Sequence, residues 1–309
     1  MGVGGRRRAD QPTPVGKDDR WHLGSNTKAM TAALYAKLVE QGRAKWGATV
    51  PELFPGLRVD PAWKTVTVEA LMSHRAGLTD AGLIDGAWLT AARSDPRPLR
   101  EQRRAFAAKA FGAAPKGTAG SFQYANANFI VVGSAIERIA GADWEQAITD
   151  GLFEPLGMRE VGFGAPRGAE PWGHGRDGSA IDPAGISDNP AALGPAGTVN
   201  ASLEDYAKFV RLFIAEGAGY LSAESVTRLT APAGPEEPSY GLGWGVFRQR
   251  GWARGPALAH EGSNTLWHAV ALVAPVRGLA VITVSNDDAR GAKATQALAQ
   301  SLIKRFAPA

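Results

Sequence analysis

The chain has 309 residues, 44% of them hydrophobic, and a formal net charge of +4. This length and apolar content suffice to bury a large core, which excludes a mostly disordered chain. Basic residues are dense only at residues 6–8 and elsewhere are mixed with acids, so we expect no nucleic-acid partner. The chain has no cysteine, which excludes disulfides, cysteine nucleophiles and thiolate metal sites.

Other ligands and compartments are also constrained by the composition. The five histidines show no metal-ligand spacing, so we expect no metal and no organic cofactor. No apolar run approaches the roughly 18 residues of a membrane helix, and the N-terminus lacks the apolar segment of a signal peptide. We therefore expect a cytoplasmic protein with no membrane contact; a periplasmic or secreted location stays open if the N-terminus is truncated.

Hydrophobic periodicity predicts helices in the first two thirds of the chain and strands in the last third. Helical patterns cover residues 26–41, 67–73, 99–111, 128–140 and 143–152, and Ser202 begins another that runs to residue 213. Strand patterns cover residues 241–247, 257–260, 266–274 and 279–285, with connections short enough to imply antiparallel pairing. We expect a C-terminal helix, residues 292–306, to pack on this sheet. Residues 164–200, rich in Gly and Pro, predict a long loop bordering the active site.

The main functional signal is the segment Ser25-Asn26-Thr27-Lys28 at the start of the first predicted helix. A helix turns once in about 3.6 residues, so Ser25 and Lys28 share a face and the amine can reach the hydroxyl. A serine hydroxyl becomes a good nucleophile when a neighbour takes its proton, and a lysine can do this if burial lowers its pKa. Tyr124 is a plausible second proton carrier.

This segment is followed in order by Tyr124-Ala125-Asn126 and His260-Glu261-Gly262. The ordered set resembles the serine β-lactamase and penicillin-binding-protein superfamily, within it the class C-like group that includes family VIII carboxylesterases and D-aminopeptidases. Further segments resemble strings of that group, in the same order: residues 74–78, 153–158, 195–197, 240–244 and 260–265.

The resemblance implies an α+β fold with an antiparallel sheet flanked by helices. The whole chain would be one catalytic unit, with an α/β lobe at about residues 1–24 and 232–309 and a helical lobe at about residues 25–231. The family's sheet begins with a strand pair ahead of the nucleophile, and this chain has only about 24 residues there. We therefore expect the first strand to be missing and only the end of the second to remain. The exposed sheet edge would favour a homo-oligomer.

The resemblance also implies roles for individual residues. Ser25 would form a covalent acyl-enzyme with Lys28 and Tyr124 as general base and acid, and the backbone N–H groups of Ser25 and Ser263 would form the oxyanion hole. Substrate-binding residues would be Asn126, His260, Gly262 and Asn264. The substrate would be a small ester or amide.

His260 bears on the substrate class, because relatives that bind carboxylates have a lysine in its place. An imidazole is mostly neutral above pH 7, which favours short-chain esters and a carboxylesterase. An arginine from elsewhere, for example Arg176, could restore the charge. The alternatives are a β-lactamase or D-alanyl/D-amino peptidase and, from another class, a non-catalytic ligand-binding relative.

Several strings compete with these assignments. Ser301 and Lys304 repeat the SxxK spacing in the middle of the C-terminal helical run, and His22-Leu23-Gly24 lies too close to Ser25 to form a facing strand. Ser187-Asp188-Asn189 copies the SDN string of class A β-lactamases, but it falls late in the order and in a loop. Taken singly, Ser25 could be a helix cap, Lys28 a solvated helix residue and His260 a hydrogen-bonded strand residue.

Overall fold

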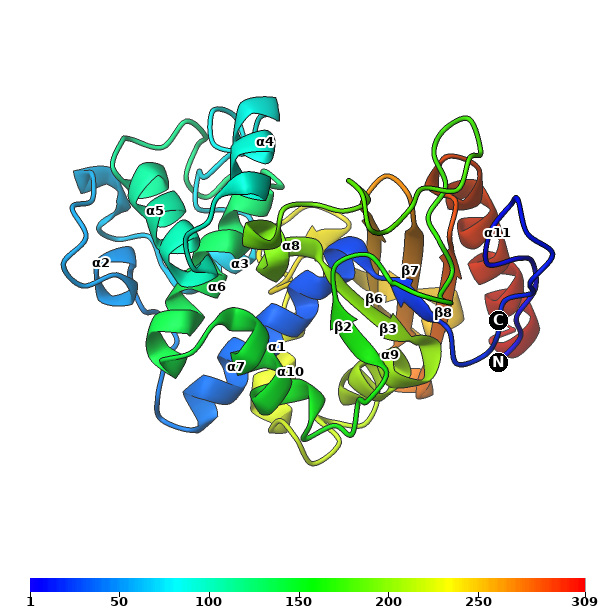
Figure 1. Ribbon diagram of the computed structural model, residues 1–309. Helices are drawn as coiled ribbons and strands as arrows, with labels where there is room; N and C mark the ends of the chain where they lie inside the picture. The colour runs from blue at the N-terminus through cyan, green and yellow to red at the C-terminus, as the bar shows by residue number, and fades with distance from the viewer. Residues whose placement is uncertain (309) are drawn as a thin grey trace.

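The computed structural model describes residues 1–308 and shows an α+β protein. Most helices gather at one end, the sheet and the C-terminal helix lie at the other, and α1 runs between them (Figure 1). The helices are α1 (Thr27–Glu40), α2 (Val50–Leu53), α3 (Val68–Met72), α4 (Gly86–Ser94), α5 (Leu99–Phe111), α6 (Asn126–Ala140), α7 (Trp144–Ile148), α8 (Gly194–Gly197), α9 (Leu203–Val210), α10 (Ala223–Thr230) and α11 (Asp288–Phe306). The strands are β1 (Arg20–His22), β2 (Val161–Phe163), β3 (Val199–Ser202), β4 (Ser239–Tyr240), β5 (Gly245–Arg250), β6 (Gly255–Ser263), β7 (His268–Ala274) and β8 (Leu279–Ser285).

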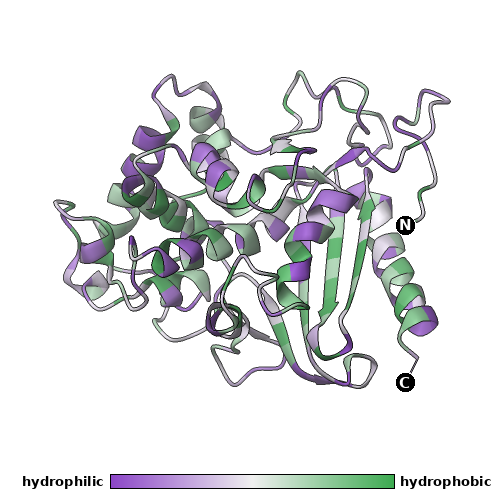
Figure 2. Ribbon diagram, turned by 90° about the horizontal axis from the view of Figure 1, so that it is seen from below, coloured by the Kyte–Doolittle hydropathy of each residue, from purple (hydrophilic) through white to green (hydrophobic). Residues whose placement is uncertain are grey.

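The larger sheet has the order β4-β5-β6-β7-β8, and every neighbouring pair is antiparallel, as the short connections predicted. Alternate residues of β7 point to opposite faces. Ala269 and Ala271 join the core that contains α1, whereas Val270 and Leu272 pack with Ala299 of α11. The prediction that the C-terminal helix covers the sheet is therefore confirmed. The strands of this sheet are largely hydrophobic in Figure 2.

Helix α1 is buried along most of its length. Its apolar side chains surround the helix axis instead of forming a single stripe, which is typical of a helix enclosed by protein on all sides. Met30, Tyr35 and Leu38 are among the side chains that it places in the core. Lys28 lies in the first turn of α1, and the 3-10 turn just before α1, which carries Ser25, meets β6.

A second, smaller sheet with the order β1-β3-β2 corrects the prediction for the N-terminal segment. The residues before Ser25 do form a strand, but it does not join the larger sheet: Trp21 pairs with Ala201 of β3. Trp21 packs with Trp267 and Ala165, and the backbone N–H of Leu23 donates to the carbonyl of Val199 at 2.9 Å. These contacts fix the direction in which the chain enters the Ser25 turn.

Strand β8 lies at an edge of the larger sheet. It pairs with β7 along its whole length, and no other strand in residues 1–308 pairs with its second side. The first residues of the chain lie at the end of β8 instead of along it, because the Asn286 amide binds the carbonyls of Arg6 and Arg7. Both termini lie near α11 (Figure 1). The predicted open sheet edge therefore exists, and it is located at β8.

The remaining differences concern short elements. The periodic patterns correctly located α1, α3, α5, α6, α7 and α9 but did not predict α2, α4, α8 and α10. Of these, α2 and α8 have only four residues each, which is too short to show a period. β6 extends to Ser263, well beyond the predicted residues 257–260. The extension matters because the additional residues reach Ser25.

Candidate active site

Ser25 lies in a turn that is held by its own neighbours. A short 3-10 helix, Gly24–Asn26, leads directly into α1. The Thr27 hydroxyl donates to the Gly24 carbonyl at 2.7 Å, and the Asn26 amide donates to the Leu23 carbonyl at 2.9 Å. The Ser25 hydroxyl is thus presented from a rigid turn at the start of a helix, where backbone N–H groups favour a developing anion.

Lys28 is fully buried, and its amine touches three oxygen atoms. The distances from Nζ are 2.9 Å to Ser25 Oγ, 2.8 Å to Asn126 Oδ1 and 2.6 Å to the Ala196 carbonyl oxygen. Burial lowers the pKa of Lys28 to about 7, and the charge of Asp80 opposes this decrease. Much of the amine is therefore neutral near neutral pH.

The three contacts also orient the neutral amine. A neutral amine has two hydrogens and one lone pair, whereas the Asn126 and Ala196 oxygens can only accept. Both hydrogens must therefore go to these two oxygens. The lone pair is left to face the Ser25 hydroxyl, which is the arrangement that a general base requires.

Asp80 holds the side-chain amide of Asn126, which in turn contacts the Lys28 amine. Its carboxylate accepts the backbone N–H groups of Asn126 and Ala127 at 3.1 and 2.9 Å, and the Asn126 side-chain amide at 3.3 Å. The last contact turns the Asn126 oxygen toward Lys28. Sequence reasoning missed Asp80, since an aspartate two residues after the segment 74–78 has no feature that marks it.

The Ala196 carbonyl is a second group that sequence reasoning missed. It belongs to α8, which is held against α1 because the Thr31 hydroxyl donates to the Pro195 carbonyl at 2.7 Å. On the other side, a Cβ at Gly133 of α6 would lie 2.2 Å from the Pro195 ring, so only glycine permits this approach. The three contacts of the Lys28 amine thus come from the 3-10 turn before α1, from α6 and from α8.

Tyr124 lies beside this amine, just before α6. Its ring centre is 4.9 Å from Lys28 Nζ. Although about two-fifths of the Tyr124 residue is exposed, its hydroxyl is enclosed in the site; this desolvation raises the pKa of the hydroxyl, and a contact with Ser25 opposes the increase. The hydroxyl therefore remains protonated, so Tyr124 is suited to donating a proton, and Lys28 is the better base.

His74 supports Tyr124 from behind. The two rings are 4.4 Å apart, and His74 is almost completely buried with a φ of 59°. Its Nδ1 faces the Ala125 backbone N–H and the Asn128 amide, both of them donors, so the ring is neutral. Burial, together with Lys28 and His260, holds the pKa of His74 well below its usual value.

The end of β6 faces the Ser25 turn at very short range. β5 pairs with β6 only as far as Ala259, which leaves the edge beyond it open. A Cβ at Gly24, where φ is 51°, would lie 2.4 Å from the Ser263 nitrogen, and one at Gly262 would lie 2.8 Å from the Ser25 nitrogen. The two predicted oxyanion-hole residues therefore belong to segments in direct contact.

Gly262 must be glycine because a side chain at this position would collide with the backbone of the Ser25 turn. A Cβ there would lie 2.0 Å from the Leu23 carbonyl oxygen. The space beside Gly262 is thus occupied by the protein's own Ser25 turn, and the residue permits an approach of two backbone segments. The assignment of Gly262 to substrate binding stays a prediction.

His260 is beside the site, but it has no free group for a substrate. Its Nε2 is 2.8 Å from the Tyr240 hydroxyl and its Nδ1 is 2.8 Å from the Glu261 carbonyl oxygen. Because that carbonyl can only accept, the proton is on Nδ1 and Nε2 accepts from Tyr240. Burial, with a smaller contribution from Lys28, lowers the pKa of His260 to about 3. Both ring nitrogens of His260 thus have partners within the protein, and its role in substrate binding stays a prediction.

Asn264 is also occupied by the protein. Its amide nitrogen donates to Asp188 Oδ1 at 2.8 Å and to the Ser187 carbonyl at 3.2 Å. Its oxygen accepts the backbone N–H groups of Leu266 and Trp267. Asn264 therefore holds the turn after Ser263, and its role in substrate binding stays a prediction.

The strings that compete with the assigned motifs, Ser301 with Lys304 and Ser187-Asp188-Asn189, do not form a second site. The Ser301 hydroxyl donates to the Ala297 carbonyl on α11, as an ordinary helical serine does. Asp188 turns to His22 and Asn264 instead of Lys28. Trp244 and Trp267 are fully buried, which makes them core residues.

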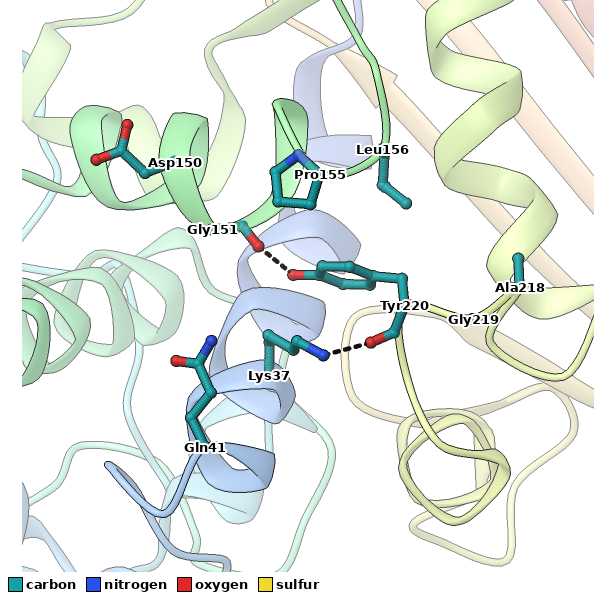
Figure 3. Close-up of a pocket in the computed structure, with 9 residues that line it drawn as sticks. All are labelled: Lys37, Gln41, Asp150, Gly151, Pro155, Leu156, Ala218, Gly219 and Tyr220. Carbon is teal, nitrogen blue, oxygen red and sulfur yellow. Dashed lines mark hydrogen bonds between the residues drawn. The ribbon is translucent and has the colours of Figure 1, made fainter.

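A hollow at the other end of α1 is a separate feature (Figure 3). Lys37 lies about 18 Å from Ser25, at a rise of about 1.5 Å per residue. Its amine donates to the Tyr220 carbonyl at 2.6 Å, and the Tyr220 hydroxyl donates to the Gly151 carbonyl. These polar groups bind one another, so this hollow lacks the reactive arrangement seen at Ser25.

Residues 1–308 contain no group of three or more His, Asp or Glu side chains placed to hold a metal ion. Within the same residues, no helix is both long and apolar enough to cross a membrane.

Comparisons with known proteins show which family the chain resembles. The family model described as "Beta-lactamase" matches residues 1–303. Penicillin-binding protein 4 of Amycolatopsis lactamdurans is 25% identical over 88% of this chain and 73% of its own length. Esterase EstB of Burkholderia gladioli is 31% identical over 48% of this chain and 40% of its own length.

Solved structures show the same fold. A penicillin-binding protein from Bacillus halodurans superimposes with a TM-score of 0.80 at 21% identity, over 97% of this chain and 91% of that one. The D-amino acid amidase of Ochrobactrum anthropi SV3 gives 0.76 at 18% identity, over 98% and 89%.

Proposed function

The chain belongs to the beta-lactamase family of serine hydrolases, and we propose that it cleaves short-chain, uncharged carboxylic esters through an acyl-enzyme on Ser25. The observation that carries this proposal is the Lys28 amine, whose lone pair faces the Ser25 hydroxyl while Asn126 and Ala196 take its hydrogens. Its pKa of about 7 makes it an effective base at neutral pH.

The residues suggest a simple proton path. The neutral Lys28 amine takes the Ser25 proton as Oγ attacks the ester carbonyl, and the new C–O bond converts that carbonyl to an oxyanion. The N–H groups of Ser25 and Ser263 stabilise the oxyanion; one such donor typically contributes about 2.7 to 4 kcal/mol. The Tyr124 hydroxyl protonates the departing alkoxide and regains a proton from the Lys28 ammonium. Water then attacks the acyl-enzyme by the reverse proton path, which releases the acid.

The substrate class follows from the charge of the site. His260 is neutral and both of its ring nitrogens are engaged, so it offers no cation to a substrate carboxylate. Within residues 1–308, no hydrogen bond or ion pair joins an arginine side chain to Ser25, Lys28, Tyr124 or His260. A hydrogen bond to a charged group contributes about 1.5 to 3 kcal/mol, so carboxylate substrates lose roughly ten- to a hundredfold in relative specificity.

Aromatic side chains supply an apolar surface instead. Phe122 and Tyr124 are both about two-fifths exposed, and the Phe122 ring lies 5.8 Å from that of Tyr240. Such a surface suits an uncharged acyl or alcohol group. The similarity to Esterase EstB supports the same assignment.

The test is the ratio of kcat/KM for p-nitrophenyl butyrate to that for nitrocefin. We expect a ratio above one and a fluorophosphonate label on Ser25 in the wild type, with no label in Ser25→Ala. A ratio below one would favour the β-lactamase alternative. Absence of both turnover and label would favour a non-catalytic relative.

A further inference from the structure

We propose that His22, Asp188 and Asn264 form a positioning unit that holds the two halves of the oxyanion hole in register. The inference rests on the proposed function, because it concerns the same N–H groups of Ser25 and Ser263. None of the three residues touches the nucleophile or the base. They act on the two backbone segments that carry the oxyanion-hole donors.

His22 holds the segment that contains Ser25. The ring is buried at the end of β1, and its Nδ1 accepts the Gly24 backbone N–H at 3.1 Å. The proton is therefore on Nε2, which donates to Asp188 Oδ2 at 2.9 Å. The ring also stacks on Trp267, with centroids 5.8 Å apart and planes 28° apart. These contacts leave the ring a single orientation.

Asn264 holds the segment that follows Ser263. It donates to the other oxygen of the same carboxylate, Asp188 Oδ1, at 2.8 Å. Its own oxygen accepts the backbone N–H groups of Leu266 and Trp267, both at 3.2 Å. The turn needs this support, because Thr265 has a φ of 76°, which is unfavourable for a β-branched residue.

Asp188 thus connects the two segments through its two oxygen atoms. Its side chain is only 9% exposed, and Oδ1 also accepts the Asn189 backbone N–H at 2.7 Å. Its backbone carbonyl accepts a hydrogen bond from Arg93 at 2.9 Å, which fixes the loop. The connection matters because β1 and the turn after β6 belong to different sheets. Without it, the spacing of the two donors would depend on the close backbone contacts at Gly24 and Gly262 and on the hydrogen bond from the Asn26 amide to the Ala269 carbonyl.

Asp188→Asn is the sharpest perturbation, since it keeps the shape of the side chain. An amide has one acceptor oxygen, whereas His22 and Asn264 together present two donors to this residue. One of the two connections is therefore lost. His22→Phe removes both hydrogen bonds of the ring and preserves its stacking on Trp267. The matched control is Asp182→Asn on the same loop, whose carboxylate accepts the Ala184 N–H at 2.8 Å.

The experiment measures kcat and KM on p-nitrophenyl butyrate, thermal unfolding, and inhibition by butylboronic acid and by butyrate. The boronic acid forms a tetrahedral adduct that uses the oxyanion hole, whereas butyrate is a planar product. Removing an oxyanion-hole donor costs about a hundred- to a thousandfold in kcat, so we expect a displaced donor to cost about ten- to a hundredfold. KM and butyrate affinity should change less than about threefold, and boronate affinity should fall by the same factor as kcat/KM.

Three results would overturn the proposal: an unchanged kcat in Asp188→Asn and His22→Phe, an equal loss in the Asp182→Asn control, or a loss of kcat without a matching loss of boronate affinity. The double variant should be no worse than the more impaired single variant, because both act through one connection. Failure of the proposed function is distinguishable, because the wild type would then show neither Ser25 labelling nor ester turnover.

Discussion

Replacing Lys28 with methionine should separate what this amine costs in stability from what it contributes to activity. The buried amine has a pKa of about 7 in the folded protein and 10.5 as the ordinary value, which we take for the unfolded chain. Between these values the unfolded chain binds a proton that the folded protein does not. Stability therefore rises with pH across this window, and the cost of burying the amine is fully present below pH 7.

The expected size follows from the two pKa values. Each pKa unit corresponds to about 1.36 kcal/mol, so the full cost is roughly 5 kcal/mol and about 2 kcal/mol of it disappears between pH 7 and pH 9. Lys28→Met has no such dependence. It also leaves the Asn126 and Ala196 oxygens without their partner, at about 1 to 3 kcal/mol each. The difference in unfolding free energy between variant and wild type at one pH therefore combines the removed burial cost with the lost hydrogen bonds. The change of this difference with pH reports the titration of the amine alone.

The assay is urea unfolding followed by tryptophan fluorescence, since the chain has nine tryptophans. Between pH 7 and pH 9, the free energy of unfolding should increase by about 2 kcal/mol more in the wild type than in Lys28→Met. The control is Lys293→Met, at an exposed position on α11, which should not reproduce this gain. A constant difference between wild type and Lys28→Met would refute the assignment of a low pKa to Lys28.

The other predictions concern activity and assembly. In the wild type, kcat/KM should rise with pH through about 7 as Lys28 loses its proton. Asp80→Asn should move this rise to lower pH, because the charge of Asp80 raises the pKa of Lys28. A pH profile that does not move in Asp80→Asn would contradict this role of Asp80. Ser25→Ala and Lys28→Ala should each remove nearly all turnover with strongly non-additive losses, and Ser301→Ala should change nothing, as measured by initial rates. The open edge of β8 should cause self-association, and a monodisperse monomer by light scattering across the micromolar range would contradict this.

The local part of the site could be predicted from the sequence. Ser25 and Lys28 lie one helical turn apart, so the pattern that predicts a helix also predicts that the two side chains meet. Tyr124 was assigned by its place in the ordered motifs. The structure indeed brings it to the same amine, 4.9 Å from its ring centre.

The groups that orient Lys28 could not be predicted in this way. The Ala196 contact is made by a backbone carbonyl, which every residue possesses, so no residue type marks it. Asp80 acts through Asn126, and its importance depends on the packing of α6 against the segment after residue 78. A sequence pattern shows which residues share an element. It does not show which backbone oxygens a buried amine will meet.

The least predictable contact is the one between His22 and Asp188. Both lie in strings that compete poorly with the catalytic motifs, because His22 is too close to Ser25 and Asp188 falls late in the order, in a loop. Neither string is a catalytic motif, yet the fold places the two side chains 2.9 Å apart, across a separation of 166 residues. The Pro- and Gly-rich composition of residues 164–200 predicts a loop but gives no direction for it. The loop's direction is set by contacts such as those of Arg93 and Asn264, which lie far from Asp188 in the sequence. Positioning residues of this kind therefore become visible only when both partners are placed in three dimensions.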